Sequence, residues 1–301
     1  YMDATNGWIP ISDDDVTKVP EAPSANPTGI FGYGTNQPEG GNTAVTNLVS
    51  NTGVVASDVT GVGTVRNALA ACEYGNDKGI FGFGYVSGAT YIDETNLVSN
   101  TGVVGTDVTG VGTARSDVAA CTYGGDKGIF GFGGAYVSTT NLVSNAGVVS
   151  TDVTGVGTAR DGSAACEYSS NKDKGIFAYG YNGSRVSLSN LVSNAGVVST
   201  DVTGVGTARL QLAACGYGGD KGIFGYGEPG AVASMTNLVS NTGVVSTDVT
   251  GVGTARKVLA ATQYGGDKGI FGFGKTSGNV GMTNLVSNTG VVATDVSAVG
   301  T

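Results

Sequence analysis

Aspartate and arginine are the chemically capable residues that recur most regularly along this chain. An Asp precedes an Arg by eight positions five times, at Asp58/Arg66, Asp107/Arg115, Asp152/Arg160, Asp201/Arg209 and Asp248/Arg256. Guanidinium groups bind carboxylates and other anions, so a ring of Arg could hold an acidic sugar such as a sialic acid. However, a single binding site needs residues that are not repeated. We therefore interpret the five arginines as a structural ring of ion pairs and hydrogen bonds.

Catalysis finds little support among the remaining polar residues. The chain has no histidine, the residue that most often exchanges protons near neutral pH. No pair of carboxylates stands apart from the repeating background. The sialidase pattern Ser-x-Asp-x-Gly-x-Thr-Trp is not met, because at Ser246 the Gly comes one residue late and no Trp follows. We predict a protein that is not an enzyme and that needs no cofactor.

The four cysteines occupy one equivalent place in successive stretches of sequence, at Cys72, Cys121, Cys166 and Cys215. They lack the Cys-x-x-Cys spacing of a metal site, and we predict no metal. Thr262 stands at the fifth such place, which indicates that the position requires a small side chain. We expect free buried thiols; disulfides between neighbouring repeats are the alternative. The run Asp13-Asp14-Asp15 is interpreted as a solvated acidic stretch.

The charge balance excludes two classes of partner. The 24 acidic and 15 basic residues give a net charge of −9. Binding to nucleic acid depends on Lys and Arg that displace phosphate counterions, so we predict no nucleic-acid partner. No apolar run approaches the length of a membrane span, so we predict no membrane insertion.

These residues belong to a long internal repeat. The tripeptide Gly-Ile-Phe begins at positions 29, 79, 128, 175, 222 and 269. A fixed period of this size is typical of repeat architectures and has to be considered before any single motif. It divides the chain into units near 29–78, 79–127, 128–174, 175–221, 222–268 and 269–301.

Each repeat contains four short apolar runs with turn residues between them. Between Arg209 and Arg256 these runs, named a to d, cover 212–215, 223–227, 236–240 and 244–249. None has a helical period, and the connections are too short for parallel crossovers. We therefore expect an antiparallel four-stranded sheet per repeat. Strict alternation along run b would place Phe224 and Tyr226 on one face and Ile223, Gly225 and Gly227 on the other.

Six such sheets with apolar faces predict an all-β fold, a six-bladed β-propeller of four-stranded antiparallel blades. The order Arg-x-x-Leu-Ala-Ala-Cys, Tyr-Gly-Gly-Asp-Lys-Gly-Ile-Phe-Gly, a loop and Thr-Asn-Leu-Val-Ser resembles the kelch repeat over about 29–301. The resemblance implies the same propeller fold. It departs from the kelch pattern in strand d, where Val244-Val245 replaces the usual Trp.

Closure of the propeller and the N-terminal segment form a separate question. Strand a occurs only five times, so we predict that residues 16–25 supply the sixth and that 16–28 close a domain of residues 16–301. Prolines in this segment suit an edge strand. Residues 1–15 lie outside the repeat. Their Gly7-Trp8-Ile9-Pro10-Ile11 resembles tether segments of bacteriophage structural proteins, which implies an anchor to other proteins of a virion or appendage.

Variation among the repeats is concentrated on one face. The b–c loops and the residues after each Arg differ from repeat to repeat, and an up-and-down blade places both at the same end. The b–c loops span 35–45, 85–94, 134–139, 181–188, 228–235 and 275–282. We predict that this face binds a partner through Tyr85, Tyr91, Tyr136, Tyr181, Arg185, Asp161 and Glu228.

Three functions remain open from the sequence. The first is a structural or adhesion protein on a virion, such as a tail fibre, or on an extracellular appendage, with the variable face recognising a host glycan or receptor. The second is an intracellular kelch-type adaptor that binds another protein. The third is a glycan-active enzyme that uses an unrepeated carboxylate such as Asp161 or Glu228.

Overall fold

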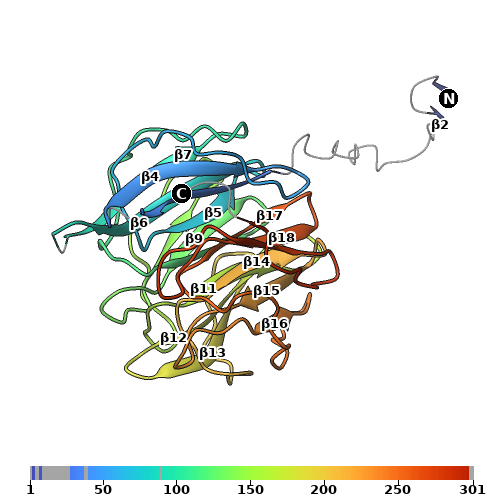
Figure 1. The fold of residues 1–301 in the computed structure, drawn as a ribbon. Coiled ribbons are helices and arrows are strands. Elements are labelled where there is room, and N and C mark those ends of the chain that lie inside the picture. The colour runs from blue at the N-terminus through green and yellow to red at the C-terminus, as the bar shows by residue number, and fades with distance from the viewer. Residues whose placement is uncertain (1, 4–6, 9–27, 37–39, 89, 298–301) are drawn as a thin grey trace.

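The described part of the chain consists of strands, turns and loops, which confirms the expectation of an all-β protein. The computed structural model describes residues 2–3, 7–8, 28–36, 40–88 and 90–297 (Figure 1). Within these residues there is no helix long and apolar enough to cross a membrane.

Three kinds of strand recur in a fixed order. A short pair at the N-terminus, β1 (Met2–Asp3) and β2 (Gly7–Trp8), stands outside this order. The a strands are β5 (Ala70–Tyr74), β8 (Ala119–Tyr123), β11 (Ala164–Tyr168), β14 (Ala213–Tyr217) and β17 (Ala260–Tyr264). The b strands are β3 (Gly29–Thr35), β6 (Lys78–Val86), β9 (Lys127–Gly131), β12 (Lys174–Tyr181), β15 (Lys221–Gly225) and β18 (Lys268–Gly272). The c strands are β4 (Asn42–Val49), β7 (Thr90–Val98), β10 (Thr140–Val143), β13 (Arg185–Val192), β16 (Thr236–Val239) and β19 (Thr283–Val286).

The strands form antiparallel sheets numbered here along the chain. The first sheet is β3-β4, and the second to sixth are β5-β6-β7, β8-β9-β10, β11-β12-β13, β14-β15-β16 and β17-β18-β19. The second to sixth sheets have three strands each, and the first has two among the described residues. The prediction of four-stranded sheets is therefore wrong.

Segment d fails to become a strand because the c strand bonds to it in another way. In the fifth sheet it meets β16 only at two isolated bridges, Thr236 to Val249 and Val239 to Val245. The c side advances three residues between these bridges and the d side four, so the ladder cannot continue. Between them the Asn237 side chain donates to the Ser246 carbonyl at 3.0 Å and to Asp248 at 2.9 Å. The other five sheets repeat this asparagine bond.

The alternation expected along strand b is also wrong at its second aromatic residue. Phe224 packs toward the fourth sheet, whereas Tyr226 packs toward the sixth sheet together with Ile223. Tyr226 has a left-handed backbone with φ of 65°, and the equivalent residues in the other sheets share it. One residue in this conformation reverses which face the next side chain occupies. Each b strand therefore sends one aromatic ring to each neighbouring sheet.

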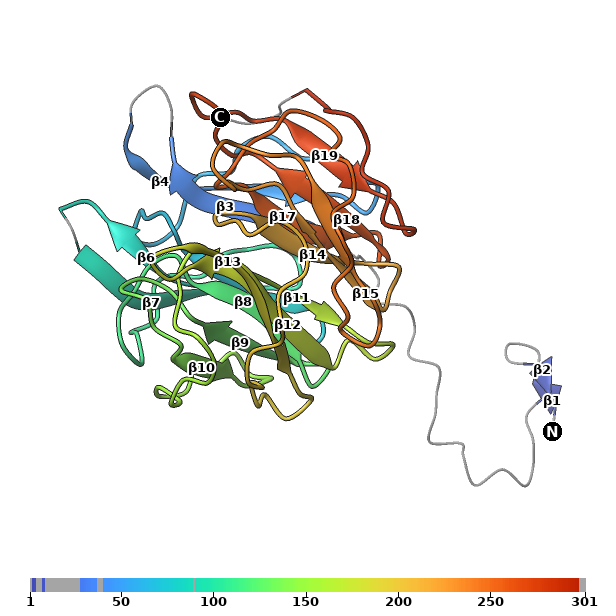
Figure 2. The same ribbon diagram turned by 90° about the horizontal axis from the view of Figure 1, so that it is seen from below.

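Successive sheets pack face to face and form a propeller-like arrangement, visible in Figures 1 and 2. Each pair of successive sheets encloses its own apolar cluster, from the first and second sheets to the fifth and sixth. A further cluster joins Phe31 of the first sheet to Tyr264 and Ile270 of the sixth, and β17 contacts β3. The first and last sheets are thus neighbours.

Glycines at the start of each b strand allow these sheets to approach closely. A Cβ placed on Gly175 would lie 2.5 Å from the Cys121 sulfur of the preceding sheet. The same contact pairs Gly128 with Cys72, Gly222 with Cys166 and Gly269 with Cys215, and Gly29 meets Thr262. All four cysteines are free thiols, as expected; Cys72 is half-buried and the other three are buried.

A buried arginine joins each sheet from the second to the sixth to the sheet before it. Arg160 precedes the fourth sheet, and its guanidinium lies 4.1 Å above the Phe132 ring of the third. It donates to the Asn190 side chain at 2.7 Å and to the carbonyl oxygens of Tyr179 at 2.7 Å and Thr158 at 3.0 Å. Burial lowers the pKa of Arg160 to about 10, which still leaves it charged at neutral pH.

The other members of the proposed ring share most of this geometry. Arg66, Arg115, Arg209 and Arg256 stack on the aromatic ring of the preceding sheet at 4.2 to 4.4 Å. The nearest carboxylate is not the Asp eight residues earlier in sequence. It is the Asp of the following repeat, as in Arg160 and Asp201 at 4.0 Å, and this Asp mainly accepts hydrogen bonds from Thr158.

The predicted closing strand at residues 16–25 lies outside the described residues. The same holds for most of the proposed tether at 1–15, of which only β1 and β2 are described.

The contact between glycine and cysteine gives a direct test of this packing. Gly175→Ala should lower the free energy of unfolding by about 1–3 kcal/mol, because the new methyl group meets the Cys121 sulfur. Cys121→Ala removes that sulfur, so the double variant should be more stable than Gly175→Ala alone. Urea unfolding of all four proteins measures the coupling. If the losses in unfolding free energy of the two single variants simply add in the double variant, the proposed contact is contradicted.

Candidate functional site

The variable loops rest on a fixed backbone arrangement at one end of the sheets. After four of the five arginines, the next residue pairs with a residue near the end of strand b, as in the bridges Asn67 to Tyr85 and Asp161 to Tyr181. Further bridges of this kind join Leu210 to Glu228 and Lys257 to Lys275. The starts of the b–c loops and the d–a corners are therefore hydrogen-bonded neighbours, and the side chains around them are held on firm backbone.

The next residue in each corner adopts a left-handed backbone. Ala68, Asp117, Gly162, Gln211 and Val258 have φ between 51° and 57°. The Asp117 amide donates to the Ala68 carbonyl, the Gln211 amide to Gly162, and the Val258 amide to Gln211, each linking neighbouring sheets. Only glycine adopts this conformation without strain. Because the links use backbone atoms, side chains can vary here from repeat to repeat.

The first predicted tyrosine pair lies at the loop end of the second sheet. Tyr85, the last residue but one of β6, pairs with Tyr91 of β7, and their ring centroids are 5.8 Å apart. Tyr91 is 51% exposed, although a side chain of this size is usually buried. This pair is thus an aromatic surface facing solvent.

A second tyrosine pair joins two successive sheets. Tyr136 comes from the b–c loop of the third sheet and Tyr181 from the end of β12 in the fourth, with ring centroids 5.8 Å apart. Tyr136 is 43% exposed, and both it and Ala135 have positive φ, 52° and 63°. Strained backbone that presents an exposed ring is typical of binding loops.

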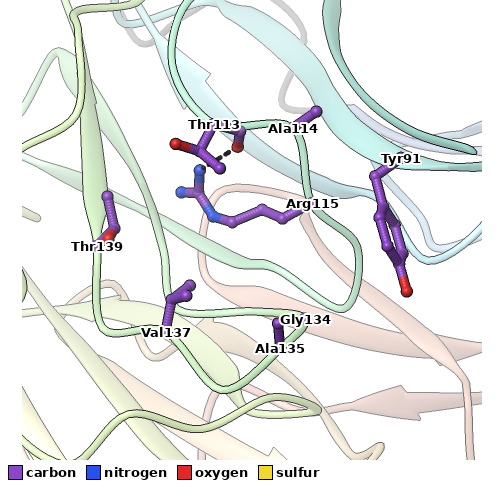
Figure 3. A pocket seen from close by; sticks show the side chains of 8 residues that line it. All are labelled: Tyr91, Thr113, Ala114, Arg115, Gly134, Ala135, Val137 and Thr139. Carbon is purple, nitrogen blue, oxygen red and sulfur yellow. Dashed lines mark hydrogen bonds between the residues drawn. The ribbon is translucent and has the colours of Figure 1, made fainter.

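A small hollow lies beside the tyrosines: Tyr91 lines it, and so do Ala135 and Val137, the neighbours of Tyr136 in sequence. It holds about 170 Å³ and is lined by Tyr91, Thr113, Ala114, Arg115, Gly134, Ala135, Val137 and Thr139 (Figure 3). Arg115 is 3% exposed and donates to the Thr113 carbonyl at 3.0 Å, so its guanidinium is already occupied. The hollow is smaller than pockets that enclose whole small-molecule ligands. It has room for one ring or one side chain of a larger partner.

The predicted charged residues form a chain of ion pairs beyond the tyrosines. Arg185 of β13 donates to the Glu228 carbonyl at 2.9 Å and pairs with its carboxylate at 3.4 Å. Lys257 of the next d–a corner donates to the same carboxylate. The hydrogen bond from Lys257 is the largest influence that lowers the pKa of Glu228. These residues fasten three neighbouring sheets together at their loop ends.

Asp161 is the predicted site residue with the most altered acidity. Partial burial, and to a smaller extent the charge of Asp117, raises its pKa to about 6. It lies beside Tyr181 through the backbone bridge described above. The structure therefore groups Tyr136, Tyr181 and Asp161, and it places Arg185 opposite Tyr181 in the pair of β12 and β13, with Glu228 bound to Arg185.

A second polar cluster lies at the opposite end and was not predicted from the sequence. Lys172 lies in the turn before β12, which is two residues longer than in the other repeats. It donates a hydrogen bond to the Gln263 side chain of β17 at 2.9 Å, although 91 residues separate them. Glu167 faces the same small pocket. The insertion at 169–172 was the only sequence signal, since the partners come from different repeats.

Among residues 28–36, 40–88 and 90–297 no group of three or more acidic or cysteine side chains is arranged as a metal site. No protein-family model matches the chain, and no curated protein matches its sequence. The resemblance to kelch repeats and to bacteriophage proteins thus gains no support from these comparisons.

The acidity of Asp161 predicts how stability depends on pH. Its pKa is about 6 in the fold and near 3.8 in the unfolded chain, so the folded state binds more protons between these values. Stability from this group is present below pH 4 and is lost as pH rises through 6. Relative to wild type, Asp161→Asn should gain about 1 kcal/mol between pH 4 and 7, a value reduced for solvent screening of this half-exposed group.

Asp201→Asn serves as the matched control with the opposite sign. Hydrogen bonds from Thr158 and Asn190 hold the pKa of Asp201 below its usual value despite partial burial. This variant should be less stable than wild type at pH 7, with a deficit that shrinks as the pH falls below 4. Urea unfolding between pH 3.5 and 7.5 measures both. A pH-independent effect of Asp161→Asn would contradict the assigned acidity.

Proposed function

We propose that the chain is a six-bladed, kelch-like β-propeller that acts as a recognition protein rather than an enzyme. The apolar cluster between the first and sixth sheets supports closure of the six sheets into one propeller. In this proposal the loop end with the two tyrosine pairs binds a glycan on a host surface. Its location is a virion or an extracellular appendage, and residues 1–15 attach it to other proteins of that assembly.

The observation that carries the proposal is the presence of two exposed aromatic surfaces at the loop end that holds the small hollow. Tyr91 and Tyr136 each expose more than two fifths of their surface, at 51% and 43%. A flat ring with one polar hydroxyl can stack on the C–H face of a sugar while donating a hydrogen bond. The small hollow can take one ring or acetyl group of the glycan, and adjacent sugars would extend over the tyrosines.

Rigid support for this surface also favours recognition. The tyrosine rings stand on backbone that is bonded from sheet to sheet, and the Arg185–Glu228–Lys257 chain fastens the neighbouring loops. Binding residues that are held in place lose little entropy when a ligand binds. Differences in sequence among the loops would then change the contacts to the ligand and not the backbone that supports them.

The full-length chain should bind a subset of bacterial surface polysaccharides on a glycan array. Tyr91→Ser and Tyr136→Ser should each weaken that binding roughly tenfold, and together with Tyr181→Ser should abolish it, because stacking surface is lost. Val244→Ser, which alters an exposed side chain at the opposite end, is the matched control and should bind normally.

Two results would overturn the proposal. Unchanged binding in the triple tyrosine variant would exclude this surface as the site. Cleavage of a bound polysaccharide that is lost in Asp161→Asn would show an enzyme instead. A protein captured from lysate in place of any glycan would favour the adaptor function.

A further inference from the structure

The inner edge of the first sheet is open among the described residues. In the other five sheets an a strand lies along this edge of the b strand, whereas β3 pairs only with β4. Ile30 is half-buried, although its five equivalents are at most 1% exposed. Ala71 and Glu73 of β5 and Ala260 of β17, which flank this edge, are exposed. Side chains around this edge are therefore more exposed than equivalent side chains in the other sheets.

One end of the β3 edge has the components of an arginine site. Wherever an a strand is present, its arginine stacks on the aromatic ring of the preceding sheet, as Arg160 does on Phe132. For the first sheet that ring is Phe273, which is half-buried and has no cation over it among the described residues. The asparagine acceptor is Asn47, 4% exposed, whose side-chain oxygen accepts no hydrogen bond from a described residue.

The middle of the β3 edge accepts only a small side chain. The equivalents of Gly79 each meet the cysteine sulfur, or Thr262, of a preceding a strand. A Cβ on Gly79 would instead find Val98 at 3.5 Å and no side chain from a preceding a strand. Space that cysteine occupies elsewhere thus holds no side chain of a described residue here.

The far end of the β3 edge accepts an aromatic ring. Five glycines in the c–d turns pack against the tyrosine of an a strand, for example Gly147 against Tyr74 and Gly196 against Tyr123. The equivalent Gly102 contacts only Leu48. The place that a tyrosine ring fills in five other joints therefore has no ring from a described residue.

We propose that the β3 edge is a binding site for an extended segment of a partner polypeptide with the pattern Arg-x-x-apolar-Ala-Ala-small-x-Tyr. The segment adds to β3 as an antiparallel strand and forms main-chain hydrogen bonds with it. Its arginine lies between Phe273 and Asn47, its small residue against Gly79 and its tyrosine beside Gly102. The five a strands of this chain carry the same three anchors, at positions one, seven and nine.

Residues 16–24 of the chain itself match this pattern poorly. With the spacing found in four of the other repeats, Val16 falls at the arginine place, Ala22 at the small place and Ser24 at the tyrosine place. The arginine and the tyrosine of the pattern are thus missing. Val16 has no side-chain donor for the buried side-chain oxygen of Asn47. This chemistry favours a segment other than residues 16–24. The site shares no residue with the tyrosine surface and goes beyond the glycan binding proposed above.

A labelled peptide with the sequence of residues 209–217, Arg-Leu-Gln-Leu-Ala-Ala-Cys-Gly-Tyr, tests the site by fluorescence anisotropy with the full chain. Binding should saturate at one peptide per chain. Replacing the peptide's arginine by alanine should weaken binding roughly tenfold or more, because stacking and a charged hydrogen bond are lost together. Phe273→Leu in the protein should weaken it comparably.

Gly79→Ala is the decisive protein variant. Its methyl group has ordinary contacts in the free chain but blocks the small residue of the incoming strand, so melting should be unchanged and peptide binding lost. Tyr136→Ser should bind the peptide normally. Absence of saturable binding, or binding indifferent to both Gly79→Ala and the peptide's arginine, would overturn the proposal. So would peptide binding that appears only after Ala22→Trp, since that result would assign the edge to residues 16–24.

Discussion

A guanidinium buried between neighbouring sheets is the interaction on which the rest of the structure depends. Removing a charge from water is costly unless its donors find acceptors. Arg160 meets this need with two backbone carbonyls, the Asn190 side chain and the face of Phe132, while the carboxylate of Asp201 stays 4.0 Å away. One side chain therefore fixes the spacing and the angle of two sheets at once. Its requirements also explain why the asparagine of strand c, the aromatic residue of strand b and the threonine before the arginine recur together in the repeats.

Because these joints secure the sheets from within, the loop end above them is free to differ. The hollow lies where the second and third sheets meet, and the Tyr136–Tyr181 pair spans the third and fourth. Candidate binding features thus stand directly over the joints, where two loops of independent sequence come together. The β3 edge is the complementary case. There the joint between the sixth and first sheets has its aromatic ring and its asparagine but no described arginine, which makes recognition of an arginine-led strand a property of the scaffold itself.

The repeat of Gly-Ile-Phe and its turn residues was sufficient to predict an all-β protein of six related sheets. The finer geometry depended on features that periodicity does not encode. Tyr226 adopts a left-handed backbone and reverses the expected alternation, and the Asn237 side chain takes the bonds that a fourth strand would need. The predicted tyrosines do lie at one end, but the pairing of Tyr136 with Tyr181 follows from how successive sheets stack. Lys172 and Gln263 meet for the same reason, and no local pattern indicates such contacts.

Native-state hydrogen exchange tests the central claim that the backbone and the side chain of an arginine together secure each joint between neighbouring sheets. The amides of Gly34, Gly84, Gly133, Gly180 and Gly227 donate to the carbonyls of Arg66, Arg115, Arg160, Arg209 and Arg256, whereas the equivalent Gly274 has no arginine acceptor among the described residues. The account predicts strong protection for the first five amides, Gly34 included, and exchange at least about a hundredfold faster for Gly274, since local opening there costs less free energy. Equal protection at all six joints would contradict it.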